Sequence, residues 1–269
     1  MSTRARRNSI QTSLGSKVFD AFNITFIVIF CISILFPIWD LLVISFSKSE
    51  HISYMRTNLW PVEWNFSSYE YCFQNATLGL AFRNSVLRTI IGSVYHLFVC
   101  CLAAFALTRT DMPLRKPITL IFLITMFISG GLIPTYLTIK NLGLTETFWV
   151  YILPGGFSMY NTIIIRNFFF SIDKAMEESA TIDGASMLKV MFYIILPLSM
   201  LVLATVGLWQ MVGQWNAWFD NMIYARSESL ITLQYLLRRM TGDIVTLISE
   251  ANQYSIVTEQ STAAAITPE

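Results

Sequence analysis

Polar and aromatic side chains gather on one face of an apolar segment of the chain. Trp209, Gly213 and Asn216 recur at i, i+4 and i+7, so they would share one face of a helix. Gln210 and Gln214 lie beside them. Amides can hydrogen-bond sugar hydroxyls and an indole ring can stack on a sugar, so this stripe is a candidate substrate pathway. The alternative is helix packing around Gly213, with the amides as interhelical hydrogen bonds.

Asn84 and Asn161 are further candidates for the same pathway. Arg83 and Arg88 lie near one end of another apolar segment, where a charge is costly unless it reaches water or a partner. These arginines could favour an acidic glycan. We expect instead that they snorkel, which means that their charged ends extend to the lipid headgroups.

The chain lacks the residue patterns of a catalytic, nucleotide-binding or metal site. No GxxxxGK[ST] phosphate loop occurs, and no Ser/His/Asp or Cys/His grouping suggests catalysis. His51 and His96 have no ligand-like neighbours, and the four cysteines form no CxxC pair. A net charge of +1 gives no nucleic-acid footprint. We therefore expect a chain that is not an enzyme and binds no cofactor.

The composition predicts that membrane helices position these polar groups. Hydrophobic residues make up 54% of the chain and charged residues 13%, against roughly 25% charged residues in a soluble domain. So little charge cannot cover a surface that faces water. The apolar surface must face lipid or other membrane helices.

Five apolar segments are long enough to cross about 30 Å of hydrocarbon at about 1.5 Å per residue. They are Val18–Ser47, Phe82–Ala106, Ile118–Thr138, Trp149–Phe170 and Ile194–Met211, the last continuing to about Asn221. The prediction is an all-α integral membrane protein whose transmembrane domain covers residues 18–223.

The charges of the connecting segments predict the orientation. The basic tail, residues 1–17, argues for a cytoplasmic N-terminus, and the basic turn 109–116 falls inside on alternation. Residues 48–81 and 140–148 then lie outside, and the long segment 171–197 lies inside. Residues 224–269 are polar and are expected outside as well.

The cytoplasmic segment 171–197 has the features of two short helices joined by a glycine. Asp173 can cap a helix that runs through Ala180, and Gly184 can end it with a left-handed turn. A second helix would begin near Ala185, and Pro197 lies near the start of the last span. Such a projecting shape suits docking into a groove of a soluble partner. An ordinary interfacial linker is the alternative.

The spacing in this segment resembles the EAA loop of ABC importer permeases. Glu178-Ser179-Ala180 is followed after three residues by Gly184, and after nine more by Ile194-Ile-Leu196-Pro197. Ser179 stands where that loop has alanine. The strings Ser129–Tyr136, Leu142–Leu144, Asn167–Ile172 and Gln214–Trp218 are similar to those of maltose-transporter-type sugar permeases, in the subgroup that serves polysaccharide fragments. The resemblance covers residues 18 to about 240.

The resemblance implies a type I ABC importer permease fold in a bacterial cytoplasmic membrane. It implies a heterodimer with a second, related permease, two ABC ATPase subunits that carry ATP and Mg, an extracytoplasmic sugar-binding protein, and an oligosaccharide substrate that could be alginate- or pectin-derived. The residues that would couple to the ATPase are Glu177, Glu178, Ser179, Ala180, Asp183, Gly184, Ile194, Leu196 and Pro197.

Two departures from the family accompany this resemblance. Asp173 stands where the family usually has proline, and both residues suit a helix start. Such permeases have six spans, so residues 224–269 are expected to lead to a sixth span that is absent from this sequence. A permease for a non-sugar solute, or a membrane scaffold without a solute, are the alternative functions.

Overall fold

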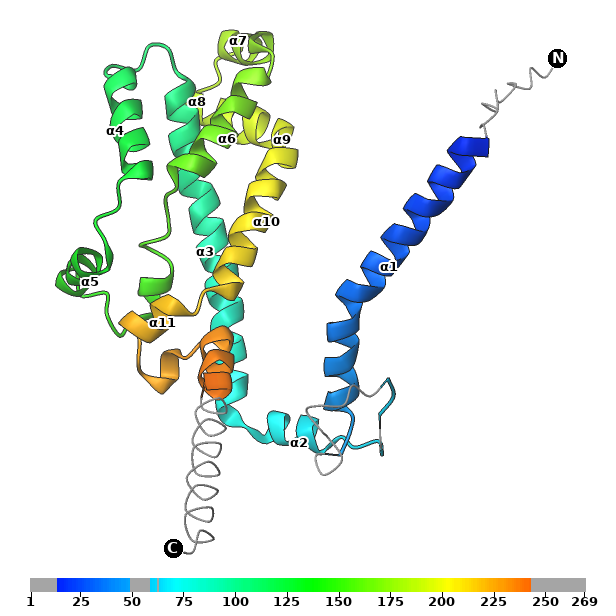
Figure 1. Ribbon diagram of the computed structural model, residues 1–269. Helices are drawn as coiled ribbons and strands as arrows, with labels where there is room; N and C mark the ends of the chain where they lie inside the picture. Colours follow the sequence, from blue (N-terminus) through cyan, green and yellow to red (C-terminus); the bar gives the residue numbers. More distant parts are fainter. Residues whose placement is uncertain (1–13, 49–58, 62, 243–269) are drawn as a thin grey trace, which may run out of the picture. The chain divides into compact units, whose positions relative to one another are not determined.

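The computed structural model describes residues 14–48, 59–61 and 63–242 (Figure 1). Part of the sequence-based prediction lies outside the described residues. This part comprises Arg4, Arg6 and Arg7 of the basic N-terminal tail, His51, and residues 243–269. The described residues are largely helical, and their only extended pairing is an isolated bridge between Ser47 and Trp64. The chain divides into two compact units, Met1–Asn75 and Ala76–Glu269.

The first unit consists of one long apolar helix followed by an aromatic cluster. Helix α1 (Leu14–Ser45) confirms the helix expected at Val18–Ser47, and large apolar side chains are exposed along its whole length. Just beyond it, Phe46 packs against the rings of Trp64, Phe66 and Tyr69. Helix α2 (Ser67–Gln74) closes the unit. An apolar surface on every side of α1 is expected of a helix surrounded by lipid or other membrane helices.

The second unit is built around α3 (Ala76–Thr108), which packs against α6 (Met159–Ser171) and α10 (Met200–Asn216). α3 runs the length of this unit (Figure 1). The core of this unit also includes residues that precede α10, and its buried members are Cys100, Cys101, Ala104, Phe105, Ile165, Phe169, Val190, Met191, Ile195 and Val206. α3 therefore connects the two ends of the unit.

Each of the last three expected spans is interrupted. Over Ile118–Thr138 the structure has two helices, α4 (Arg115–Phe127) and α5 (Leu132–Asn141). The chain bends by 117° between them. The break contains Gly131 with a φ of +84°, a conformation that favours glycine. Over Trp149–Phe170 only α6 is α-helical, preceded by the 3-10 turn η2 (Phe148–Tyr151).

The fifth expected span is bent by 81° between Met187–Leu198 and Met200–Asn216. The expectation that it continues to about Asn221 is wrong, because α10 ends at Asn216 and a separate helix, α11 (Phe219–Tyr224), follows. In the described residues, two continuous helices are long and apolar enough to cross a membrane, or up to four if each bent pair is one span. Five spans are therefore not confirmed. Hydropathy measures composition and does not detect where glycine, proline or a cap ends a helix.

The segment expected to form two helices around a glycine does so. Helix α7 (Lys174–Ile182) begins at Asp173, whose carboxylate accepts a hydrogen bond from Ala175 N at 3.0 Å. Gly184 has a φ of +80°. Ser186 caps α8 (Met187–Val190), so the second helix begins two residues later than expected. The π-turn η3 (Met191–Ile195) and α9 (Leu196–Leu198) then lead to α10.

The other end of the second unit is formed by α11, the 3-10 turn η4 (Glu228–Leu230) and a helix that includes residues 233–242. In Figure 1, α7 and α11 lie at opposite ends of α3.

Candidate functional site

The tip of the helix–glycine–helix segment is open to solvent. Glu178, Ser179, Asp183 and Gly184 are exposed, whereas Ala180 is half-buried against the core of the second unit. Several large apolar side chains are exposed on the same segment: Met176, Ile182, Met187, Leu188 and Tyr193. A β-carbon added at Gly184 would meet nothing within 4 Å, so this position needs glycine for its conformation and not for space.

The carboxylates of the two neighbouring glutamates of α7 have different surroundings. Glu178 is exposed, whereas Glu177 pairs with Arg109, the first residue after α3. The Arg109 guanidinium also lies over the ring of Phe105, 4.1 Å from its centroid. Burial lowers the pKa of Arg109 and nearby Asp111 opposes this, but an arginine remains charged at any physiological pH. The pair ties α7 to the end of α3.

A pocket of about 640 Å³ lies beside this pair, between the end of α3, α6 and α7. Its lining includes Arg109, Asp111, Lys174, Glu177 and Glu178, so charges of both signs surround it.

The remaining predicted coupling residues follow α8 in the sequence, between the tip and α10. Ile194 and Leu196 are half-buried and Pro197 is exposed.

Trp209, Gly213 and Asn216 are all exposed on α10. Trp209 keeps 50% of its surface, and Gly213 has no atom within 4 Å of an added β-carbon. Gln234 Nε2 donates to Asn216 Oδ1 at 3.3 Å, and Gln210 is half-buried. The structure thus brings three of the predicted pathway residues to one open face of the unit.

The other predicted pathway residues, Asn84, Asn161 and Gln214, bond within the protein. Asn84 Nδ2 donates to two backbone carbonyls, of Ser229 and Ile231, at 2.9 Å each. Asn161 Nδ2 lies 2.8 Å from His96 Nε2, while His96 Nδ1 lies 2.9 Å from the carbonyl of Gly155.

Gln214 is buried, accepts from Arg88 Nε at 3.0 Å and donates to the Tyr151 carbonyl at 3.4 Å. A role of these three amides in the substrate pathway stays a prediction. In this structure each of them joins elements that are distant in sequence.

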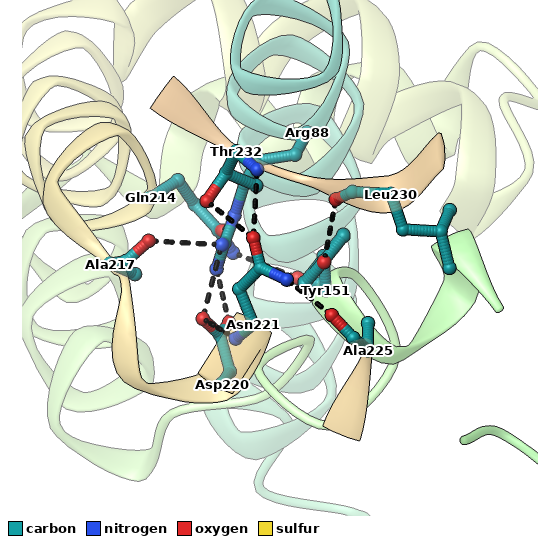
Figure 2. A network of polar contacts seen from close by, with 9 residues as sticks. All are labelled: Arg88, Tyr151, Gln214, Ala217, Asp220, Asn221, Ala225, Leu230 and Thr232. Atoms are coloured by element: carbon teal, nitrogen blue, oxygen red, sulfur yellow. Dashed lines mark hydrogen bonds and ion pairs between the residues drawn. The ribbon is translucent and has the colours of Figure 1, made fainter. Parts of the chain in front are cut away.

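Arg88 lies at the centre of a buried polar network (Figure 2). Its side chain is only 2% exposed and lies over the ring of Tyr151, 4.6 Å from the centroid. Nη1 donates to the Ala217 carbonyl and to Asp220 Oδ1, both at 3.1 Å, and Nη2 donates to Asp220 Oδ2. The expectation that Arg88 snorkels to the headgroups is wrong, because Asp220 supplies its counter-charge inside the protein. Arg83 is exposed.

Sequence reasoning missed Asp220, although a signal for it existed. Asp220 is the only acidic residue between positions 184 and 227, and Arg83 and Arg88 are the only charged residues of α3. Single opposite charges in two apolar stretches are expected to pair, because an unpaired charge in a membrane protein is costly.

The same network fastens the segment that follows α10. Asn221 Oδ1 accepts from Thr232 N at 2.7 Å and from Thr232 Oγ1 at 3.0 Å. Tyr151 donates its hydroxyl proton to the Leu230 carbonyl at 2.9 Å. Ser85 Oγ on α3 accepts from Leu233 N at 2.8 Å. This segment is therefore held by side chains from α3 and η2 (Figure 2).

A second carboxylate, that of Glu146, also holds this segment. Glu146 accepts from the backbone N–H groups of Arg226 at 3.0 Å and Ser227 at 3.1 Å. Its own N–H donates to the Tyr224 carbonyl at 2.9 Å. In the described residues no three or more His, Cys, Asp or Glu side chains form a group that could hold a metal ion.

Comparisons with known proteins identify relatives among transport permeases. No family model matches the chain. The chain is 33% identical over 227 residues to the polygalacturonan/rhamnogalacturonan transport system permease protein YtcP of Bacillus subtilis, covering 84% of this chain and 79% of that protein. It is 32% identical over 265 residues to protein LplC of the same organism, covering 97% and 90%.

Among solved structures, the chain resembles a bacterial ABC transporter involved in the import of the acidic polysaccharide alginate. The TM-score is 0.80 at 27% identity, and the match covers 95% of this chain and 99% of that one.

Proposed function

Because the chain belongs to the permease subunits of ABC transporters that import sugars and polysaccharides, we propose that it forms half of a translocation pathway for oligosaccharides cut from acidic polysaccharides. One relative is named for polygalacturonan and rhamnogalacturonan, and the structural neighbour for alginate. Both names support a substrate that carries carboxylates. A second, related permease supplies the other half of the pathway.

The observation that carries the proposal is the exposed tip formed by α7, Gly184 and α8. Its apolar side chains and the free carboxylate of Glu178 suit a groove on an ATPase subunit. ATP and Mg are bound by the two ATPase subunits, and this chain contributes neither a cofactor nor a catalytic group.

Closure of the ATPase pair moves α7, which is tied to α3 by Glu177 and Arg109 and packed on the core through Ala180. The pathway then shifts between inward- and outward-facing states because the ATPase binds each state differently.

The proposal also orients the chain in a bacterial cytoplasmic membrane. The N-terminus and the α7 end lie in the cytoplasm, and the α11 end lies outside, where it receives a sugar-binding protein. The exposed face of α10 with Trp209, Gly213 and Asn216 then lies along the pathway towards the second permease. On this face the indole and the amide would contact the sugar.

The test is ATP hydrolysis by the reconstituted complex. This chain is co-expressed with its neighbouring permease and ATPase genes, placed in lipid, and assayed with and without sugar-loaded binding protein. Glu178→Lys and Gly184→Pro are expected to abolish the stimulation seen with wild type. A panel of uronic and neutral oligosaccharides then identifies the substrate class. A stable complex whose hydrolysis ignores every binding protein and both substitutions would favour a scaffold and rule out the importer.

A further inference from the structure

Three neighbouring polar side chains of α3 all bond to one segment far along the chain. Asn84, Ser85 and Arg88 bond to residues between Gln214 and Leu233. We call residues 217–233 the outer segment. Asn84 and Ser85 precede Arg88 by four and three residues, so each lies next to Arg88 on the surface of α3. Their partners include three backbone carbonyls, of Ala217, Ser229 and Ile231, so the bonds fix the path of the backbone.

Arg88 is the most constrained of the three. Four of its five N–H groups have acceptors: one on Nε, two on Nη1 and one on Nη2. The acceptors come from α10 (Gln214), from the corner after it (Ala217) and from α11 (Asp220). A guanidinium is a planar fork whose bonds to a carboxylate fix both distance and angle. The corner between α10 and α11 is therefore held in one orientation on α3 (Figure 2).

This arrangement argues against a direct role of Arg88 in binding an acidic sugar. Its side chain is 2% exposed, the ring of Tyr151 covers one face, and Asp220 already neutralises its charge. The charge of Arg88 is therefore compensated without any carboxylate from a sugar. A buried ion pair is also weak evidence for stability alone, because apolar residues of similar size often replace such a pair without loss. What the pair provides in addition is a fixed orientation of the corner between α10 and α11 relative to α3.

We propose that Arg88 and Asp220 are a positioning pair that makes the outer segment move together with α3 and α10. Contact of a binding protein with the outer segment is then transmitted along α3 to the pair of Arg109 and Glu177 at its other end. The inference rests on the proposed function, since it names the internal contact through which binding outside changes ATP hydrolysis inside. The outer segment and the pair of Arg109 and Glu177 are then coupled by one rigid element, α3. No chain of further interacting residues is required.

The test compares two variants with wild type in the reconstituted complex. Asp220→Asn removes the counter-charge and leaves Arg88 charged and buried. The double variant Arg88→Met/Asp220→Asn removes both charges, so it avoids an unpaired charge that could prevent folding. In both, basal ATP hydrolysis per assembled complex is expected to stay near wild type. Stimulation by sugar-loaded binding protein is expected to fall about tenfold, within the usual range of couplings between two sites.

A disulfide provides the readout that a purely structural role would not move. Leu233 N lies 2.8 Å from Ser85 Oγ, so Ser85→Cys/Leu233→Cys can join the outer segment to α3 after assembly. The exposed Cys31 and Cys72 are first replaced by serine. Oxidation is expected to restore stimulation in the double variant, and reduction to abolish it again. The same cysteine pair with Arg88 and Asp220 intact is the control.

The outcomes separate this inference from the proposed function. If wild type is stimulated and the variants are stimulated equally, the positioning pair is refuted while the importer stands. If the variants assemble but oxidation does not restore their stimulation, rigid attachment is not the cause. Failure of both variants to assemble, cross-linked or not, would make the pair a folding element and also overturn the inference. Wild type without stimulation by any binding protein would instead refute the proposed function.

Discussion

At the scale of single residues, two neighbouring glutamates of α7 have different surroundings. Glu177 and Glu178 are identical in type, but one pairs with Arg109 and the other faces solvent. The cap at Asp173 and the turn at Gly184 could be predicted from the sequence because each depends on its nearest neighbours. The partner of Glu177 could not, since Arg109 lies far earlier in the sequence and only the fold brings the two together.

Glu177→Gln is expected to lower the amount of sugar imported per ATP hydrolysed by about threefold, as loss of a half-exposed ion pair of about 0.5 to 1 kcal/mol implies. Binding of the ATPase subunit should be unchanged, because Glu177 faces α3. Glu178→Gln is the matched control on the next residue and should weaken that binding instead. The measurement is sugar uptake and phosphate release in the same vesicles. An Arg109→Glu/Glu177→Arg exchange that recovers no coupling would count against the tether.

Gly184→Ala is expected to destabilise the exposed tip by about 1 to 2 kcal/mol, the usual cost of a left-handed backbone for a residue with a β-carbon. The surrounding space is open, so no clash adds to this cost. Gly184→Asn should lose less, because asparagine tolerates this conformation. Affinity for the ATPase subunit, measured by titration, should rank wild type, asparagine, alanine. Equal affinity for all three would mean that the turn is not needed for docking.

At the scale of elements, composition predicted where apolar segments lie and missed where they break. The glycine pairs at 130–131 and 155–156, each close to a proline, were available signals for the interrupted third and fourth spans. Hydropathy averages over these residues because it weighs their polarity and not their geometry. The bend before α10 was harder to foresee, since Pro197 alone is also tolerated at a helix start.

Gly156, in the break before α6, has no room for a side chain. A β-carbon there would overlap the ring of Tyr95 on α3. Gly156→Ala is therefore expected to cost about 1 to 3 kcal/mol through overpacking, measured as a lower thermal midpoint in detergent. Tyr95→Ala in the same chain should remove most of that penalty. Additive losses in the double variant would show that the two residues are not in contact.

At the scale of the whole molecule, the second unit has a coupling tip at one end, a fastened outer segment at the other, and α3 between them (Figure 1). The resemblance in sequence predicted the family, and the relatives and the structural neighbour confirm it. The single charges of Arg88 and Asp220 were a signal for that pair, but the other bonds of the buried polar network could not be predicted, because they join neutral groups as far apart as 148 positions.

Chemical labelling of the exposed face of α10 would distinguish a sugar pathway from simple helix packing. In a background without Cys31 and Cys72, Gly213→Cys is expected to react with a hydrophilic thiol reagent in the assembled complex, and substrate should slow the reaction severalfold. Val212→Cys, on the neighbouring exposed face, is the control and should react without protection by substrate. The measurement is the labelling rate by mass spectrometry. A cysteine at 213 that the reagent never reaches would indicate helix packing around this position.

The buried pair also has a consequence for the order of events during synthesis. Arg88 emerges 132 residues before Asp220, which at about 5 to 20 residues per second is a delay of roughly 7 to 26 seconds. During that interval α3 carries an uncompensated charge that is costly at the membrane interior. We therefore expect the nascent helix to remain near water or the insertion machinery until the corner after α10 is made. Ribosome stalling before position 220 should leave α3 open to surveillance proteases, and release past it should close that window.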